Sequence, residues 1–548
     1  MTTTKKHVLI IIMSNILSHG LLLIVTGTFW DDWFYYYRDR VGLWKEFMEL
    51  GRPSSAYWVE AVWNIPHYGY RWLVFLVFTL TALILYIIIR NFGMFTAKEA
   101  LWLSVLYSVI PVNDARIILC TFSYGVGLAS FLAGAYILQK YMQDRENNRF
   151  SFRIAALLLL GYSFIIQSLL VFYVVVLFCI LYYEYQNRRK ILETIKAMIK
   201  YADFILLPIS FWIGKQILFP AYGSSADYNA VTMGAVVKAA FRLPLAVIKQ
   251  AERNWIGIFD FAIPGNAVVV CTIFVVLYVF IQIGIWLRGQ ISHGISILTC
   301  IGVGGGQNND LPKLLLGIFL FALGLYPYNV VRGADEVLIV GVESRDSLLL
   351  APGMAIMLYY FFKLLFRNIK ARRMIYGILI LCCCISCNCH YLNYQRDAYW
   401  QEALISKLRI NEEVREVHNL LFFSDDVNGT NGTRFYTLNG AASVAFGDQT
   451  RLILTEGSYQ LLRDSEEKKR CVNSRRMLMN EYNIFNDKLD GVIVYNCDIS
   501  YKECILLKLQ ELVDTEKYWE QIEKMGELNY YPADSREAEE LIDGMGIL

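Results

Sequence analysis

Two adjacent carboxylates, Asp31 and Asp32, stand among aromatic residues in the stretch Thr28–Tyr35. The stretch follows the first long apolar run, so it places both acids where a membrane span meets water. We expect the indole rings of Trp30 and Trp33 to shield the acids from water in part, and partial desolvation makes a carboxylate a better base or metal ligand. The alternative is that the two acids only mark the boundary of an aromatic belt.

A third carboxylate, Asp114, lies in the short turn Pro111–Arg116 between two further apolar runs. We expect this turn on the same side of the membrane as Asp31 and Asp32. Carboxylates from two loops are what an enzyme needs to activate a hydroxyl group or to hold a divalent cation. The alternative is a structural turn capped by Asn113 and Asp114.

Four cations are candidates for contact with a phosphate group. Arg345 lies in Val342–Ser347, directly before an apolar run, where its planar guanidinium can bind the phosphate of a membrane-embedded molecule in a bidentate manner. The other three candidates are Lys215, Arg38 and Arg71. Each of these, taken alone, also fits a long side chain that reaches from a span to the membrane interface.

The composition indicates a polytopic membrane protein. Hydrophobic residues make up 56% of the 548 residues and aromatic residues 15%, and the mean hydropathy is positive, which is more apolar than the surface of a soluble protein allows. The formal net charge is only +2, and no basic cluster is interleaved with aromatic residues. A nucleic-acid partner is therefore not expected.

Apolar runs predict about eleven transmembrane helices in an otherwise all-α fold. They lie near residues 7–29, 70–90, 98–112, 117–138, 153–167, 169–184, 202–220, 266–287, 311–327, 348–366 and 374–390.

The stretch 153–184 is too long for one tilted helix, so we divide it at the polar pair Gln167-Ser168. The connections densest in Lys and Arg, such as 140–153 and 188–200, belong in the cytoplasm. This bias predicts a cytoplasmic N-terminus and an extracytoplasmic chain after about residue 391. The expected location is the plasma membrane, which in a bacterium is the cytoplasmic membrane.

Two connections on the outer side, 43–65 and 221–265, carry apolar residues at helical spacing. They predict amphipathic helices on the outer face, which either cradle a lipid tail or cover the bundle. After the transmembrane module, residues 1–395, the sequence becomes charged and mixed, and it predicts a small extracytoplasmic α/β domain over 396–548. Its expected elements are a helix near 399–418 and strands at Leu421–Phe423, Arg434–Leu438, Leu452–Thr455 and Gly491–Tyr495.

The cysteines give weaker signals. The cysteines within Cys382–Cys389 lie in the last apolar run, and no second cysteine motif accompanies them. We therefore expect them to pack as small apolar side chains and not to bind a metal. Cys471, Cys497 and Cys504 lie in the expected outer domain and allow one disulfide of undetermined pairing.

The layout resembles that of the integral-membrane glycosyltransferases of the C type. The resemblance rests on Asp31-Asp32 in the first outer loop, Asp114 in the second, the helices of 43–65, and Arg345 in a late outer loop. More narrowly, Asp31-Asp32-Trp33, Trp44 and Gly51-Arg52-Pro53 are similar to the bacterial O-antigen glucosyl transferase family of serotype conversion. The similarity covers about the first third of the chain and leaves the C-terminal domain unmatched.

The resemblance implies a hexosyltransferase that uses a polyprenyl-phosphate-linked sugar and a glycan or lipid-linked acceptor at the outer membrane face. Asp32 would be the base, with Asp31 as the close alternative; Asp114 would orient the acceptor or a metal, and Arg345 would stabilise the leaving phosphate. No cofactor is firmly implied, although a divalent cation such as Mg²⁺ or Mn²⁺ would fit. The competing hypothesis is a transporter or flippase for a lipid-linked sugar, which would need ionisable residues at mid-depth in the spans.

Overall fold

The structure is a computed structural model. It describes residues 3–36, 40–63, 65, 67–143, 150–223, 231–259, 310–333, 336–366, 368–424, 435–447, 451–456, 459 and 488–544. The predicted span 266–287, Arg38 and Cys471 lie outside these described residues.

The chain forms two compact units, which are described separately below. The helical unit comprises Met1–Ile24, Gly51–Pro220 and Asn229–His390, and the C-terminal unit comprises Val25–Leu50, Ala221–Tyr228 and Tyr391–Leu548. The segment with Asp31 and Asp32 therefore folds with the C-terminal part of the chain. One helix, α18 (Ile369–Ile410), contributes residues to both units.

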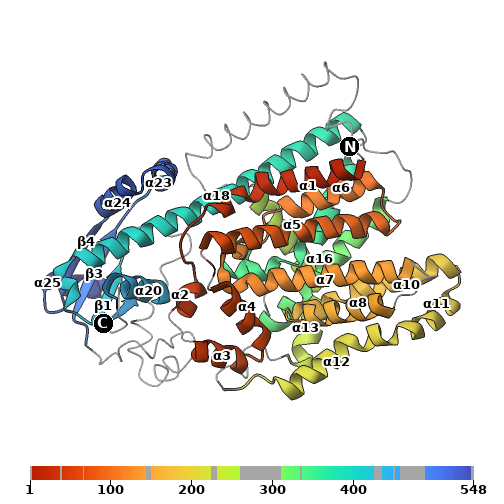
Figure 1. Ribbon diagram of the computed structural model, residues 1–548, viewed down its shortest axis with the longest axis horizontal. Helices are drawn as coiled ribbons and strands as arrows, with labels where there is room; N and C mark the ends of the chain where they lie inside the picture. The colour runs from red at the N-terminus through yellow and green to blue at the C-terminus, as the bar shows by residue number, and fades with distance from the viewer. Residues whose placement is uncertain are drawn as a thin grey trace. The chain divides into compact units, whose positions relative to one another are not determined.

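The helical unit is built from helices and short 3-10 turns (Figure 1). Its elements are α1 (Thr3–His19), η1 (Gly20–Leu23), α4 (Pro53–Trp63), α5 (His67–Asn91), α6 (Ala97–Val109), η2 (Asp114–Ile117), η3 (Leu119–Thr121), α7 (Phe122–Gln143), α8 (Phe150–Ser163), α9 (Ser168–Phe172), α10 (Val174–Arg188), α11 (Ile191–Met198), η4 (Ile199–Tyr201), α12 (Ala202–Leu218), α13 (Met233–Ile258), α16 (Asp310–Arg332), η6 (Val342–Ser347), α17 (Leu350–Leu365) and the first part of α18.

Among the described residues, seven helical segments are long and apolar enough to cross a membrane, so the protein is a multi-pass membrane protein. They are Thr3–Leu23, Gly69–Asn91, Leu119–Gln143, Ser168–Arg188, Ile191–Leu218, Asp310–Val331 and Ile369–Ile410. Two shorter apolar helices, Phe150–Ser163 and Leu350–Leu365, fall at predicted spans.

The predicted helix boundaries hold in some places and fail in others. The break predicted at Gln167-Ser168 is present, because α8 ends at Ser163 and α9 begins at Ser168. The first span was predicted to reach Phe29, but its regular helix ends at His19 and the following 3-10 turn ends at Leu23. The predicted break between residues 390 and 399 is also wrong, because α18 is continuous there.

Helix α6 lies at the centre of the helical unit. Every residue from Glu99 to Val109 is buried, so the helix is packed on all sides, as its lack of a polar face predicts. It starts at a capping box, in which Thr96 Oγ1 accepts from the Glu99 backbone N–H and the Glu99 carboxylate accepts from the Thr96 backbone N–H. This rigid helix leads directly into the turn that carries Asp114.

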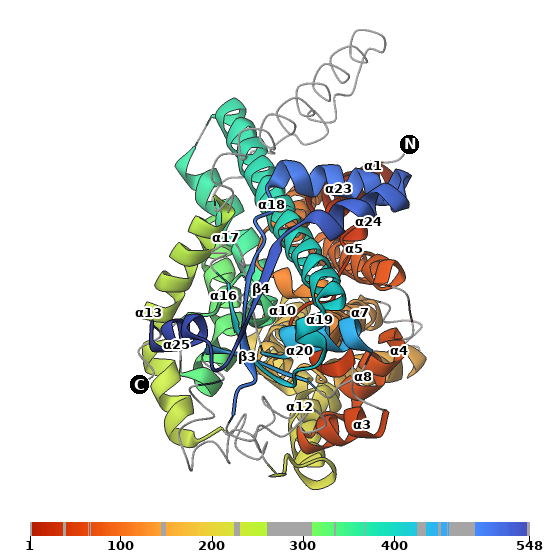
Figure 2. The same cartoon turned by 90° about the vertical axis from the view of Figure 1, so that its left-hand side faces the viewer.

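The C-terminal unit contains a four-stranded mixed sheet of order β2-β1-β3-β4. Strands β1 (Asn419–Phe423), β2 (Leu452–Thr455) and β3 (Gly491–Asn496) are parallel, and β4 (Glu527–Pro532) pairs antiparallel with β3, beside which it is seen in Figure 2. The other elements are α2 (Asp31–Tyr36), α3 (Arg40–Glu49), the end of α18, α19 (Glu412–Arg415), α20 (Phe435–Phe446), α23 (Tyr501–Val513), α24 (Thr515–Lys524) and α25 (Arg536–Gly544).

Both faces of this sheet are covered. Leu420 and Phe422 pack into one apolar cluster and Leu421 into another on the opposite face, as the two-residue period of a strand requires. Ile493 and Val492 of β3 divide between the two clusters in the same way. The strands are therefore continuous apolar runs, which is typical of parallel sheets.

Candidate functional site

The Asp114 turn follows α6 and is held in place from several sides. Asp114 is 7% exposed, and its Oδ1 lies 2.9 Å from Nδ1 of His390 on α18. Because an ionised carboxylate can only accept, the Nδ1–H of His390 is the donor. Among the described residues, Asp114 Oδ2 has no hydrogen-bond partner.

The Asp114 turn and the Arg345 turn contact each other, although they are far apart in sequence. Elements η2 and η6 pack together, and the backbone N–H of Ala115 donates to Ser344 Oγ at 2.8 Å. Ser344 Oγ in turn donates to the Gly341 carbonyl at 2.6 Å. The structure thus brings together the segments of two predicted site residues, Asp114 and Arg345.

Two carboxylates lie close to the guanidinium of Arg345. Its Nη2 lies 3.8 Å from Glu343 Oε2, and its Nε lies 4.0 Å from Asp346 Oδ1. The side chain is only 16% exposed. Since neighbouring acids balance its charge, Arg345 would attract a phosphate less strongly than an uncompensated cation would.

Arg71 is a core residue of the helical unit. It is 1% exposed at the start of α5, so it does not reach out to an interface as the alternative interpretation required. Its guanidinium carbon lies 5.2 Å from the ring centroid of Tyr70, and the Tyr70 hydroxyl donates to the Ile118 carbonyl at 2.5 Å. Arg71 therefore adjoins a residue that fixes the end of the Asp114 turn.

Lys215 shares a cavity of about 450 Å³ with Arg52. Arg52 belongs to the Gly51-Arg52-Pro53 motif ahead of α4, and Lys215 lies near the end of α12. The remaining lining is mostly apolar and comprises Gly51, Pro53, Ser54, Phe164, Ile165, Gln167, Phe211, Gly214, Leu218 and Phe219. The cavity thus combines two cations with apolar walls.

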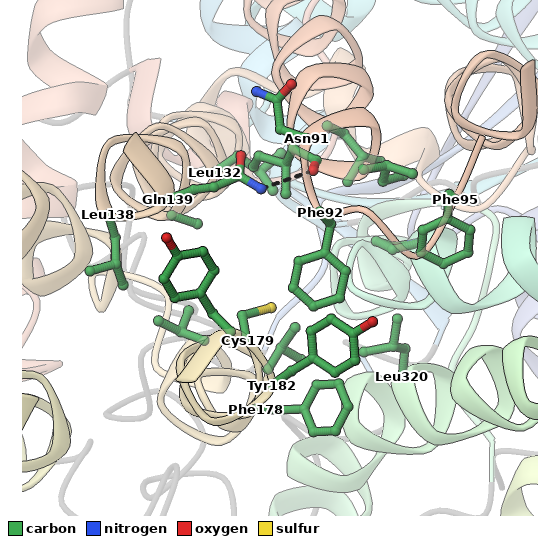
Figure 3. A pocket seen from close by; sticks show the side chains of 18 of the residues that line it. Asn91, Phe92, Phe95, Leu132, Leu138, Gln139, Phe178, Cys179, Tyr182 and Leu320 are labelled. Carbon is green, nitrogen blue, oxygen red and sulfur yellow. Dashed lines mark hydrogen bonds between the residues drawn. The ribbon is translucent and has the colours of Figure 1, made fainter. Parts of the chain in front are cut away.

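A second cavity, of about 410 Å³, is almost entirely apolar and is shown in Figure 3. The stacked rings of Phe92 and Tyr182, 4.8 Å apart, form part of its wall. Its polar rim includes Asn91 and Gln143, which end α5 and α7. The Asp114 turn lies near the other ends of these helices, because Tyr70 is at the start of α5 and Leu119 comes just before α7. This cavity is therefore separate from the Asp114 turn.

Asp31 and Asp32 belong to the C-terminal unit and begin helix α2. Asp32 is buried at 4% exposure, whereas Asp31 is partly buried. Asp31 Oδ1 accepts a hydrogen bond of 3.1 Å from the Tyr436 hydroxyl on α20. Trp33, which was expected to shield the pair, is itself buried at 5% exposure.

Sequence patterns did not single out His390, Arg52 or Tyr436 as site residues. The histidine and the tyrosine meet their carboxylates only through long-range folding, so no local spacing could identify them. Arg52 did carry a signal, because it is the centre of the Gly-Arg-Pro motif. In the described residues no group of three or more His, Cys, Asp or Glu side chains is arranged to hold a metal ion.

No family model matches the chain, and no curated protein matches it.

Proposed function

We propose that the chain is an integral-membrane glycosyltransferase. It moves a sugar from a polyprenyl-phosphate donor to a cell-surface glycan or lipid-linked acceptor at the outer face of the membrane, with its N-terminus in the cytoplasm and about eleven spans. The observation that carries this proposal is the cavity that Arg52 and Lys215 line together with apolar side chains.

A lipid phosphate joins an anionic head to a long hydrocarbon chain, and this cavity is complementary to both parts. The cations supply charge for the phosphate, and rings such as Phe164 and Phe211 supply apolar surface. Lys215 lies near the end of an apolar segment, Ile191–Leu218, where a lysine side chain can meet the head group of a membrane lipid.

The proposed reaction is a displacement at the anomeric carbon. The acceptor hydroxyl oxygen forms the new bond to this carbon while the bond to the phosphate oxygen breaks, and the phosphate leaves with the electron pair. Asp32, or Asp31 beside it, takes the hydroxyl proton as general base. Arg52 and Lys215 stabilise the charge that develops on the phosphate.

Asp114 and the Arg345 turn have a supporting role in this mechanism. The carboxylate of Asp114 is buried and bonded to His390, so it is suited to orienting a substrate group. Two cations can neutralise a lipid phosphate without a metal ion, and we therefore expect transfer to persist in EDTA. Loss of transfer in EDTA would instead assign the divalent cation a role.

The test uses purified full-length protein in liposomes that contain undecaprenyl phosphate. We expect Lys215→Met and Arg52→Met each to weaken binding of this lipid about tenfold or more, the effect of losing one charge-assisted contact of about 1.5–3 kcal/mol. Lys238→Met, at an exposed position on α13, is the matched control. Equal binding by all four proteins would overturn the phosphate site.

A second measurement separates transfer from transport. Membrane vesicles with and without the protein receive polyprenyl-phosphate sugar labelled in the sugar. A transferase moves the label from the lipid to a glycan or a second lipid, whereas a flippase moves labelled lipid across the membrane with the sugar still attached. Translocation without cleavage would refute the proposed enzyme.

A further inference from the structure

The acidic loop, residues 25–36, packs on the end of α18 and on α20 within the C-terminal unit. Thr26 and Gln395 exchange two hydrogen bonds, of 3.0 Å and 2.9 Å. The Trp33 Nε1–H donates to Gln401 Oε1 at 3.1 Å. These contacts fasten the loop on both sides of the acidic pair.

Helix α20 presents two residues to this loop at a helical spacing of four. Tyr436 donates its hydroxyl hydrogen bond to Asp31, and Gly440 lies against the Trp33 ring, where an added Cβ would come within 2.3 Å of Cε3. Residues four apart share one face of a helix. One face of α20 therefore meets both the acid and the indole that follows it.

The neighbouring face of α20 is fixed to the sheet. The Asn439 amide donates to the Ile453 carbonyl at 2.8 Å and accepts from the Ile453 backbone N–H at 2.9 Å. Ile453 is in β2. The helix that carries Tyr436 is thus hydrogen-bonded to strand β2 of the sheet.

The loop is held in a conformation that an isolated loop would avoid. Trp30, directly before the acidic pair, has φ of +55°, which is rare and strained for a bulky residue. Such strain persists only where surrounding contacts over-determine the backbone. The contacts of α18 and α20 are of this kind.

We propose that the C-terminal unit holds the acidic pair in its working geometry and that Tyr436 is a positioning residue for Asp31. This inference rests on the proposed function for its catalytic consequence. The Tyr436 hydroxyl fixes the orientation of the Asp31 carboxylate, and thereby the start of α2 that carries Asp32. Residues of the C-terminal unit that touch no substrate, Tyr436 among them, would then be required for full activity.

The decisive variant is Tyr436→Phe, which removes the hydroxyl and keeps the ring. We expect kcat to fall about 10- to 100-fold with little change in the donor KM, because a mispositioned base weakens the transition state more than donor binding. Tyr531→Phe, in β4 of the same unit, is the matched control. Gly440→Leu provides a second variant, since its side chain must displace the Trp33 ring.

Two further readouts distinguish positioning from a general loss of structure. In an Asp31→Ala background, Tyr436→Phe should lower kcat by less than threefold, because the acceptor of the Tyr436 hydrogen bond is already gone. Hydrogen exchange of residues 28–36 should quicken in Tyr436→Phe while exchange in strands β1 and β3 stays unchanged.

The outcomes separate this inference from the proposed function. If the parent protein transfers no sugar but Tyr436→Phe still quickens exchange in the loop, the glycosyltransferase proposal fails and the positioning contact stands. If the parent is active and Tyr436→Phe matches Tyr531→Phe in kcat and in loop exchange, the inference is overturned. A fall in kcat that is fully additive with Asp31→Ala would also overturn it.

Discussion

Nδ1 of His390 donates to Oδ1 of Asp114 across 2.9 Å, and both side chains are buried within the helical unit. The pair joins the long helix α18 to the turn that follows the central helix α6. Burying a carboxylate without a hydrogen-bonded partner is costly, so each residue depends on the other for its place in the core.

We predict that His390→Ala lowers the free energy of unfolding by about 1–3 kcal/mol, the cost of leaving a buried acceptor unsatisfied. Removing the charge as well, in Asp114→Asn/His390→Ala, should cost less than the sum of the two single changes. Thermal unfolding of the purified variants in detergent measures this. Strict additivity would show that the two side chains do not interact.

The acidic pair gives the second prediction. Asp32→Asn should lower sugar transfer by about 100-fold or more, because Asn keeps the shape and cannot accept a proton as a base. Asp31→Asn should have the smaller effect, since Asp31 is already engaged by Tyr436. Rates are compared with those of Glu516→Gln, an exposed acid on α24. Near-normal rates in both Asp variants would leave the pair as a structural boundary.

Part of the fold follows from local patterns. The strands predicted at Leu452–Thr455 and Gly491–Tyr495 are present, because a short apolar run buried on both faces is easy to recognise. The two helices expected within 43–65 occur as α3 and α4. The edge strand β4 was not predicted, because its residues are partly exposed and form no apolar run.

Other predictions failed where neighbours override a local pattern. The strand predicted at Arg434–Leu438 is wrong: residues from Phe435 onward form α20, in which Leu438, Ala441 and Ala442 are buried at helical spacing. The helix break expected after residue 390 is absent because the polar residues there are satisfied inside the protein. Asn388 donates to the Leu17 carbonyl, and Gln395 is bonded to Thr26.

The third prediction concerns the close packing of α16 and α17. A Cβ on Gly353 would lie 2.3 Å from the backbone N of Phe321, so only glycine allows this approach, as at many contacts between membrane helices. We expect Gly353→Ala to lower the free energy of unfolding by about 1–3 kcal/mol through overpacking. Gly234→Ala on α13, where an added Cβ meets no atom within 4 Å, is the control and should be neutral or slightly stabilising. Equal unfolding temperatures for the two variants would refute the tight contact.

The last prediction tests the orientation inferred from Lys and Arg, and it uses the thiol chemistry of the C-terminal unit. Burial raises the pKa of the Cys504 thiol to about 12, against smaller lowering effects of Arg396 and Lys508. Because the thiolate is the reactive form, Cys504 should resist maleimides at pH 7–8 while the protein is folded and react once it is unfolded. An exposed thiol has no such protection.

A cysteine placed at exposed Glu520 on α24, in a Cys471→Ser background, should therefore be labelled by a membrane-impermeant maleimide in intact cells. The same protein without the Glu520→Cys change sets the background label, to which Cys497 and Cys504 should add little because both are buried. An equivalent cysteine at exposed Lys190, in a predicted cytoplasmic connection, should be labelled only after lysis. Labelling of the Glu520 position only after lysis would place the C-terminal unit in the cytoplasm. The proposed acceptor at the outer face would then be excluded, because Asp31 and Asp32 fold within that unit.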